Sequence, residues 1–252
     1  MIKLLKLFSA LLCTLFSAHA LASYIDIVGL SVGPTWGSGN KTQTFYLQPD
    51  ILKSYVAESN THTFTTAEIF VAQQKEISEK YLGQLGISLQ GAGNARLSGD
   101  ILEDASPDFN NANYSYKLNH AYVAAKARVI KTDVSNQYLI LPYASGSLGV
   151  GFNHAYYFRN IPKITEEVAT PNFKNQTKTS FSYTFGLGLQ KAIIPQIQAA
   201  IGYEFADWGR SKLARANNQT LNQGLSLKHF YAQQLQFSLF YTPKEMSHAI
   251  EK

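Results

Sequence analysis

The sequence predicts an all-β protein, an eight-stranded antiparallel up-and-down transmembrane β-barrel, on three observations. First, large apolar side chains alternate with Gly, Ser, Thr or Gln in residues 181–190 (FSYTFGLGLQ) and 196–205 (QIQAAIGYEF). Successive side chains of a strand leave opposite faces of the sheet, so period two indicates strands. Second, the alternate positions that share one face of a strand (one parity) carry bulky aromatics, and those of the other face carry small polar residues. This suits a barrel with lipid outside and a filled polar lumen inside. Third, no run after residue 22 is long and apolar enough for a spanning helix, so the chain could cross a membrane only as a closed barrel.

The first 22 residues have the features of a secretory signal peptide. Lys3 and Lys6 form a basic start, residues 7–16 an apolar core, and residues 18–20 an A-x-A cleavage site, with cleavage after Ala22 as the alternative. A lipoprotein signal at Cys13 is disfavoured because a bulky Leu12 precedes it. We therefore expect residues 23–252 to form a single barrel domain.

Eight strand-like segments follow in the mature chain. They are centred on residues 24–32, 67–71, 81–90, 121–129, 138–152, 181–190, 196–205 and 234–241. Long polar inserts alternate with short turns between them. The long inserts cover about 34–65, 91–113, 159–179 and 209–225, and the short turns lie near 75–79, 131–136 and 194–195.

An even strand number, with long loops at one end and tight turns at the other, is typical of bacterial outer-membrane barrels. Eight strands leave a lumen that side chains can fill, so we expect no wide pore. The soluble alternative is a lipocalin-like barrel, but that fold would direct large apolar residues inward around a ligand. Here the second parity carries Gly, Ser and Gln, which favours the membrane barrel.

Charge and cysteine content exclude several classes of function. Loss of Lys3 and Lys6 with the signal peptide lowers the formal net charge from +5 to +3, which is too weak to indicate a nucleic-acid partner. The same cleavage removes Cys13, the only cysteine, so the mature chain has neither disulfide nor thiol chemistry.

Three segments resemble a known family. Residues 142–158 (PYASGSLGVGFNHAYYF), 181–193 (FSYTFGLGLQKAI) and 201–209 (IGYEFADWG), followed by a terminal amphipathic strand, are similar to the small outer-membrane β-barrels of Gram-negative bacteria. These are the opacity-protein and OmpA-type proteins, often labelled porin-like. The resemblance implies an eight-stranded barrel, periplasmic termini, and surface loops that contact host cells in some members. Such barrels usually end on an aromatic residue; Tyr241 can take that place here, although residues 242–252 follow it.

Four charged residues are predicted to point into the lumen, and six aromatics to lie near the loop-side strand ends. The lumen charges are Glu68, Lys126, Arg128 and Glu204. Because isolated buried charge is costly, we expect them to form a structural plug of ion pairs, with a proton or ion path as the alternative. The aromatics are Trp36, Tyr156, Tyr157, Phe158, Phe205 and Trp208. We expect them to form an interfacial girdle, with ordinary packing as the alternative.

No motif predicts catalysis, a cofactor or a metal. The mature histidines lack ligand spacing. His154 with Ser147, or His229 with Ser226 or Asp207, could form a catalytic pair, as in outer-membrane lipid-modifying enzymes, but no H-x-S or G-x-S-x-G pattern supports either pair.

The sequence thus favours a monomeric outer-membrane protein with a structural or surface-interaction role. We expect its partners to be outer-membrane lipid and lipopolysaccharide, together with a host-surface or envelope partner bound by the long loops. A small-solute channel is the alternative, and an enzyme is a more distant one.

Overall fold

The computed structural model describes residues 26–39, 41–58, 63–133, 140–163 and 172–242. The predicted signal peptide and the tail after residue 242 lie outside the described residues. The elements are strands, apart from η1, a single 3₁₀ turn at Pro107–Phe109. No helix in these ranges is long and apolar enough to cross a membrane.

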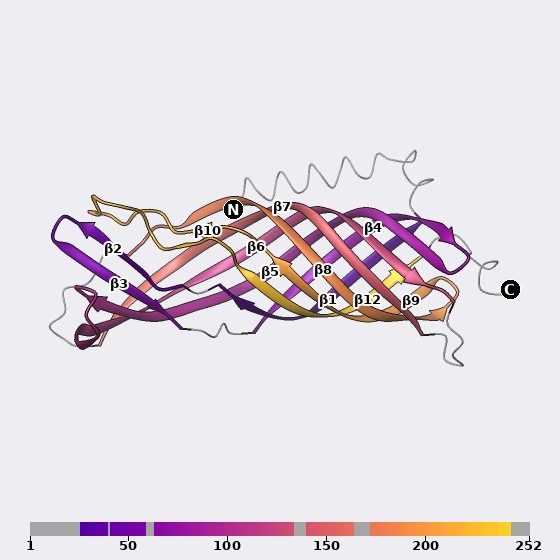
Figure 1. The fold of residues 1–252 in the computed structure, drawn as a ribbon, viewed down its shortest axis with the longest axis horizontal. Coiled ribbons are helices and arrows are strands. Elements are labelled where there is room, and N and C mark those ends of the chain that lie inside the picture. The colour runs from indigo at the N-terminus through magenta and orange to yellow at the C-terminus, as the bar shows by residue number, and fades with distance from the viewer. Residues whose placement is uncertain (1–25, 40, 59–62, 134–139, 164–171, 243–252) are drawn as a thin grey trace.

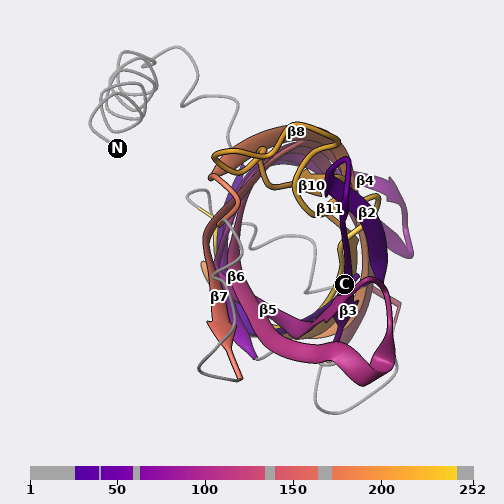
Figure 2. The same ribbon diagram turned by 90° about the vertical axis from the view of Figure 1, so that its left-hand side faces the viewer.

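Eight antiparallel strands pair in a closed ring, in the order β1-β4-β5-β6-β7-β8-β9-β12 and back to β1. Their bounds are β1 Ile27–Ser38, β4 Phe64–Ser78, β5 Tyr81–Glu103, β6 Asn110–Lys131, β7 Leu141–Pro162, β8 Gln176–Ile194, β9 Ile197–Asp207 and β12 Tyr231–Tyr241. The strands cross the barrel at a tilt (Figure 1), and the view along the barrel shows the closed ring (Figure 2). The predicted eight-stranded up-and-down barrel is confirmed.

The barrel has a short-turn end and an extended end. At the short-turn end, tight turns join β4 to β5 and β8 to β9. At the extended end, β5, β6 and β7 run well beyond the ring, and the hairpin of β2 (Gln43–Gln48) and β3 (Ile51–Ala57) pairs with the end of β5 (Figure 1). We call the part built by this hairpin, the outer halves of β5–β8 and residues 208–230 the extension.

The extension corrects the predicted long inserts. Residues 91–113 are mostly strand, because β5 continues to Glu103 and β6 begins at Asn110. The insert at 34–65 contains the β2–β3 hairpin. The insert at 209–225 contains the short strand β10 (Ser211–Lys212), which pairs with β11 (Ser226–Leu227) at the mouth of the ring (Figure 2). These segments are polar on average, but buried apolar side chains such as Tyr55, Leu97 and Leu213 recur within them.

Candidate functional site

The two faces of the ring strands differ in chemistry. Outward-facing large apolar side chains are exposed all around the ring. They include Leu30, Val32, Ile69, Leu85, Ile87, Val123, Leu148, Val150, Phe181, Phe185, Leu187, Leu189, Ile201, Tyr203, Phe237 and Leu239. The inward positions of the same strands are buried and largely polar. A continuous apolar belt of this size is untenable in water and matches the hydrocarbon layer of a bilayer. The chain is an eight-stranded transmembrane β-barrel.

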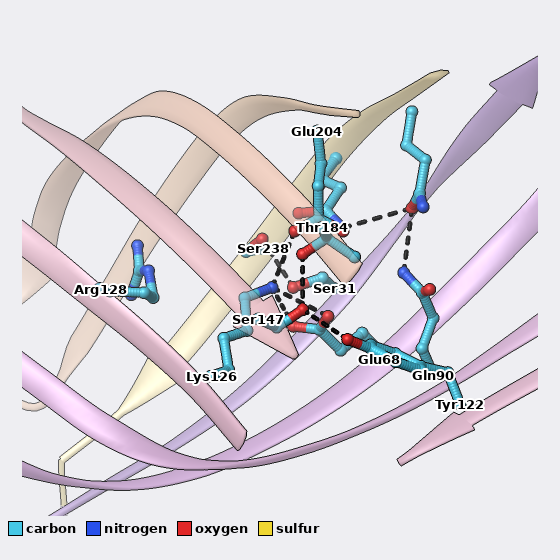
Figure 3. Close-up of polar contacts among 12 residues, drawn as sticks. Ser31, Glu68, Gln90, Tyr122, Lys126, Arg128, Ser147, Thr184, Glu204 and Ser238 are labelled. Carbon is cyan, nitrogen blue, oxygen red and sulfur yellow. Dashed lines mark hydrogen bonds and ion pairs between the residues drawn. The ribbon is translucent and has the colours of Figure 1, made fainter. Parts of the chain in front are cut away.

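Three charged side chains meet inside this barrel. Lys126 Nζ on β6 donates to Oε1 and Oε2 of Glu68 on β4, at 2.7 and 2.9 Å, and to Oε2 of Glu204 on β9, at 3.0 Å (Figure 3). All three residues are at most 5% exposed. The ammonium group therefore bridges strands on opposite parts of the ring, and it neutralises one of the two carboxylate charges.

The fourth predicted lumen charge has different partners. Arg128 Nη1 donates to Gln84 Oε1 at 2.8 Å and Nη2 to Gln190 Oε1 at 3.0 Å. Its guanidinium group lies 4.2 Å from the ring centre of Tyr143 and 4.0 Å from that of Phe240. Arg128 thus lies among amide oxygens and aromatic faces, not against a carboxylate. The four buried charges still sum to zero.

Neutral polar side chains fill the rest of the lumen. Tyr122 Oη lies 3.0 Å from Ser147 Oγ, which lies 2.7 Å from Thr184 Oγ1 (Figure 3). On the other wall, Ser238 Oγ donates to Ser31 Oγ at 2.8 Å. These contacts satisfy buried polar atoms across neighbouring strands, as a lumen packed with side chains requires.

A layer of stacked rings closes the lumen toward the extension. The His120 and Trp208 rings are parallel within 4°, with centroids 4.3 Å apart, and Trp208 also stacks on Phe230 at 5.1 Å. Asn153 Nδ2 holds this layer by donating to the Trp208 carbonyl at 2.7 Å. Trp208 and Phe230 are at most 1% exposed, so their rings are packed on all sides at this level of the interior.

Above this layer the interior is mainly aromatic and aliphatic, and the Lys53–Glu103 ion pair is partly buried there. The Tyr55 ring lies within 5.5 Å of the Tyr114 ring at a steep angle and within 5.4 Å of the Phe173 ring, and Phe158 packs on Phe173 at 4.8 Å. Burial, and secondarily the charge of Glu103, raises the pKa of Tyr55 well above its usual range. The extension is therefore a folded module with its own aromatic core.

The six predicted girdle aromatics fall into two groups. Trp36 and Tyr157 are exposed, while Tyr156 and Phe205 are half-buried on the wall of the barrel. Phe158 and Trp208, in contrast, are buried inside, so their prediction as interfacial residues is wrong. Phe158 and Trp208 lie near the strand ends expected from the sequence, but the folded structure continues past these ends and encloses both side chains.

The histidine pairings that no motif supports differ in the structure. Ser147 points into the lumen, whereas His154 lies on the outer wall with Nδ1 2.8 Å from Thr177 Oγ1, so this pair is not formed. His229 Nδ1 does lie 2.7 Å from Asp207 Oδ2, and Asp207 Oδ1 accepts the Gly209 N–H at 2.8 Å. The Ser226 side chain is 3.3 Å from Gln43 instead. The Asp207–His229 pair joins the end of β9 to the start of β12.

Sequence parity identified the lumen charges, but it could not identify their partners. Gln84 and Gln190 lie on the polar parity of their strands, yet nothing in the sequence couples them to Arg128. The Tyr143 and Phe240 rings were missed because both face inward among polar neighbours.

Comparisons with solved structures find small outer-membrane barrels. Neisserial surface protein A is 11% identical over 86% of this chain and 96% of that chain, with a TM-score of 0.45. Ail, the attachment invasion locus protein of Yersinia pestis, is 15% identical over 86% and 97%, at a TM-score of 0.34. OprG of Pseudomonas aeruginosa is 10% identical over 86% of this chain and 96% of its own, with a TM-score of 0.44. No family model and no curated protein matches the sequence. The barrel assignment stands on the strand pairing itself.

Proposed function

We propose that this chain is an integral protein of a Gram-negative outer membrane that acts as a closed surface scaffold, without channel or catalytic activity. The observation that carries the proposal is the double closure of the interior. The lumen is filled by the Glu68–Lys126–Glu204 cluster and its polar neighbours, and the extension above it by a buried aromatic core. A solute would have to displace both layers to pass.

The asymmetry of the two ends supports an orientation. Outer-membrane barrels keep tight turns on the periplasmic side and larger segments on the cell surface. The extension would then face the exterior, and its folded core would hold the β2–β3 hairpin in a fixed geometry. A rigid surface module of this kind suits recognition of a host-surface or envelope macromolecule, because little ordering entropy is lost on binding. The ring leaves no unpaired edge in the membrane, which suits a monomer.

Electrical recording in planar bilayers tests the closed state. The mature chain is refolded into lipid, and a faster unboiled band on SDS gels first establishes that the barrel has formed. We expect the folded protein to give no stable conductance steps. Discrete, reproducible steps would contradict the scaffold and establish the channel alternative. A change in the mass of lipid A when the protein is overexpressed would instead establish the alternative of a lipid-modifying enzyme.

Replacing the hairpin tests the surface role. Substituting residues 43–57 by a Gly-Ser linker of equal length should abolish adhesion of expressing cells to host-cell or envelope preparations. It should also leave the heat-modifiable band in place, since this hairpin lies outside the ring. The matched control is a Gly-Ser insertion at the β8–β9 turn after Ile194. Unchanged adhesion in the hairpin variant would contradict recognition through this part of the extension.

A further inference from the structure

Three cations converge on the outer wall of the barrel, just beyond the apolar belt. Arg96 on β5 lies directly opposite Lys117 on β6, and Arg159 on β7 lies opposite Ser115, two residues from Lys117. Like charges directly opposite each other in a sheet are destabilising. Within the described ranges, no carboxylate forms an ion pair with any of the three. Two acidic side chains at this end of the barrel have other contacts: Asp100 on β5 accepts from Lys163, and Glu58 after β3 accepts from Ser98.

A strained tyrosine lies between these cations. Tyr157 has a φ of 57°, a conformation that costs energy in a residue with a bulky side chain. The pairing of β6 with β7 shifts register between Ser115 and Lys117, and this β-bulge turns the Tyr157 side chain outward. The Tyr157 N–H donates to Asn175 Oδ1 at 3.0 Å, which holds the strained backbone in place.

The Tyr157 ring organises two of the cations. The Arg159 guanidinium lies 4.2 Å from its centre and the Lys117 ammonium 5.3 Å from it. Arg96, Lys117, Tyr157 and Arg159 line one shallow groove of about 290 Å³. Backbone strain, a β-bulge and opposed like charges each destabilise the fold, and all three occur at this groove. A bound anion would compensate for the charge repulsion.

The height of the groove indicates where such an anion would come from. Ala121 and Phe152 pair at the upper edge of the apolar belt, and Lys117 lies four residues further along β6. At about 3.3 Å per residue and the usual strand tilt, Lys117 is roughly 10 Å above that edge. Long basic side chains at this height reach the headgroup layer of a bilayer.

We propose that Arg96, Lys117, Tyr157 and Arg159 form a binding site for the phosphate of an outer-leaflet lipid headgroup. The guanidinium and ammonium groups would donate to the phosphate oxygens, and the Tyr157 ring holds the cations in a cluster before the lipid binds. The site rests on the proposed outer-membrane location and orientation but not on the proposed scaffold role, because a channel or an enzyme could carry it equally.

Lipid binding to the folded full mature chain tests the site. The barrel is purified in a neutral detergent, its fold is checked by heat-modifiable mobility, and bound lipids are counted by native mass spectrometry. The probes are phosphatidic acid, phosphatidylcholine and inorganic phosphate. We expect the wild type to retain phosphatidic acid at least tenfold more tightly than phosphatidylcholine. The triple variant Arg96→Gln, Lys117→Gln, Arg159→Gln should lose about tenfold of that affinity.

A matched triple variant controls for total charge. The triple variant Lys41→Gln, Lys174→Gln, Lys228→Gln removes three exposed cations elsewhere at this end of the barrel and should bind as the wild type does. Equal binding by the wild type and the first triple variant would overturn the site. Competition by inorganic phosphate at the same concentration as the lipid would overturn the lipid as the source of the phosphate.

A fourth variant separates ligand binding from simple packing. Tyr157→Gly relieves the positive φ and removes the ring. We expect it to resist heat in SDS as well as or better than the wild type, while binding phosphatidic acid several-fold more weakly. Loss of heat resistance with unchanged lipid binding would show that the tyrosine serves stability alone, and would remove it from the site.

Discussion

The membrane ring and the extension are built largely from the same strands, but the inward face of these strands is polar in the ring and apolar in the extension. On β6, Lys126 and Arg128 point inward at the level of the belt, where Val123 and Val129 are exposed outward. Further along the same strand the inward positions are Leu118, Tyr116 and Tyr114, and the outward ones are Asn119, Lys117, Ser115 and Asn113. The change marks the level at which the surroundings change from lipid to water, so the solvent outside decides which parity is apolar.

On β5 the same change coincides with a bulge. The register with β6 shifts between Ala92 and Ala95, so the inward parity changes from Gln84, Ser88 and Gln90 to Ala95, Leu97 and Ile101. An extra residue moves every later side chain to the other face. A polar interior therefore needs many specific pairings, whereas a mainly apolar interior is stabilised chiefly by packing.

The strongest test of this contrast removes the cation at the centre of the lumen. Lys126→Met leaves the Glu68 and Glu204 carboxylates buried without the ammonium group that donates to both, and we expect a loss of about 3–5 kcal/mol in the free energy of unfolding. Urea titration in lipid vesicles measures it. The double variant Glu68→Gln, Lys126→Met removes one charge of each sign, keeps Glu204 to balance Arg128, and should regain most of that stability. A loss under about 1 kcal/mol for Lys126→Met would mean that the cluster is not dry.

The matching change in the extension is Phe230→Ala. This residue is fully buried beneath Trp208, and its truncation should cost the extension about 3 kcal/mol through lost burial and a cavity. Hydrogen exchange should show loss of protection in β2, β3 and the outer part of β5, with the membrane part of the ring still protected. Uniform loss of protection would show that the two regions unfold as one unit.

The outer face is tested by paired arginine substitutions on β9. Ile201 faces outward beside Leu189 and Phe237, so Ile201→Arg should destabilise the inserted barrel by about 2–4 kcal/mol near the midplane. Gln198, on the inward parity and 2.9 Å from Gln190, should tolerate Gln198→Arg with a smaller loss. Folding yield into vesicles over a urea series gives both values. Equal losses would contradict the assigned facing.

The smallest effect is expected at the Asp207–His229 pair on the rim. The His229 side chain is about half exposed, so His229→Gln should change the stability by less than about 1 kcal/mol. Because Asp207 still accepts the Gly209 N–H, the β9 end should keep its conformation. Circular dichroism melting in detergent measures the change. A larger loss would indicate that this pair fastens β12 to the ring.

Much of the fold was predictable from the sequence because alternation is a local property. Residues 181–190 and 196–205 carry it plainly, and both are ring strands with the predicted facing. The same alternation is present in residues 95–101 and 113–119, but with the opposite facing, because there the apolar side chains point inward. The two-residue period therefore continues along these strands, while the polar and apolar faces exchange sides.

The eight ring strands, their facing within the belt and the presence of four charges on the lumen side could be predicted from the sequence, since each depends on neighbours one or two residues away. Which of these charges meet depends on the tertiary structure. Glu68, Lys126 and Glu204 come together because ring closure places β4, β6 and β9 around one narrow lumen. Likewise, Trp208 and Phe158 are interior residues because the strands rise above the bilayer into water, where burying aromatic surface is favourable. How far a strand extends beyond the membrane depends on partners distant in the chain, which local alternation does not encode.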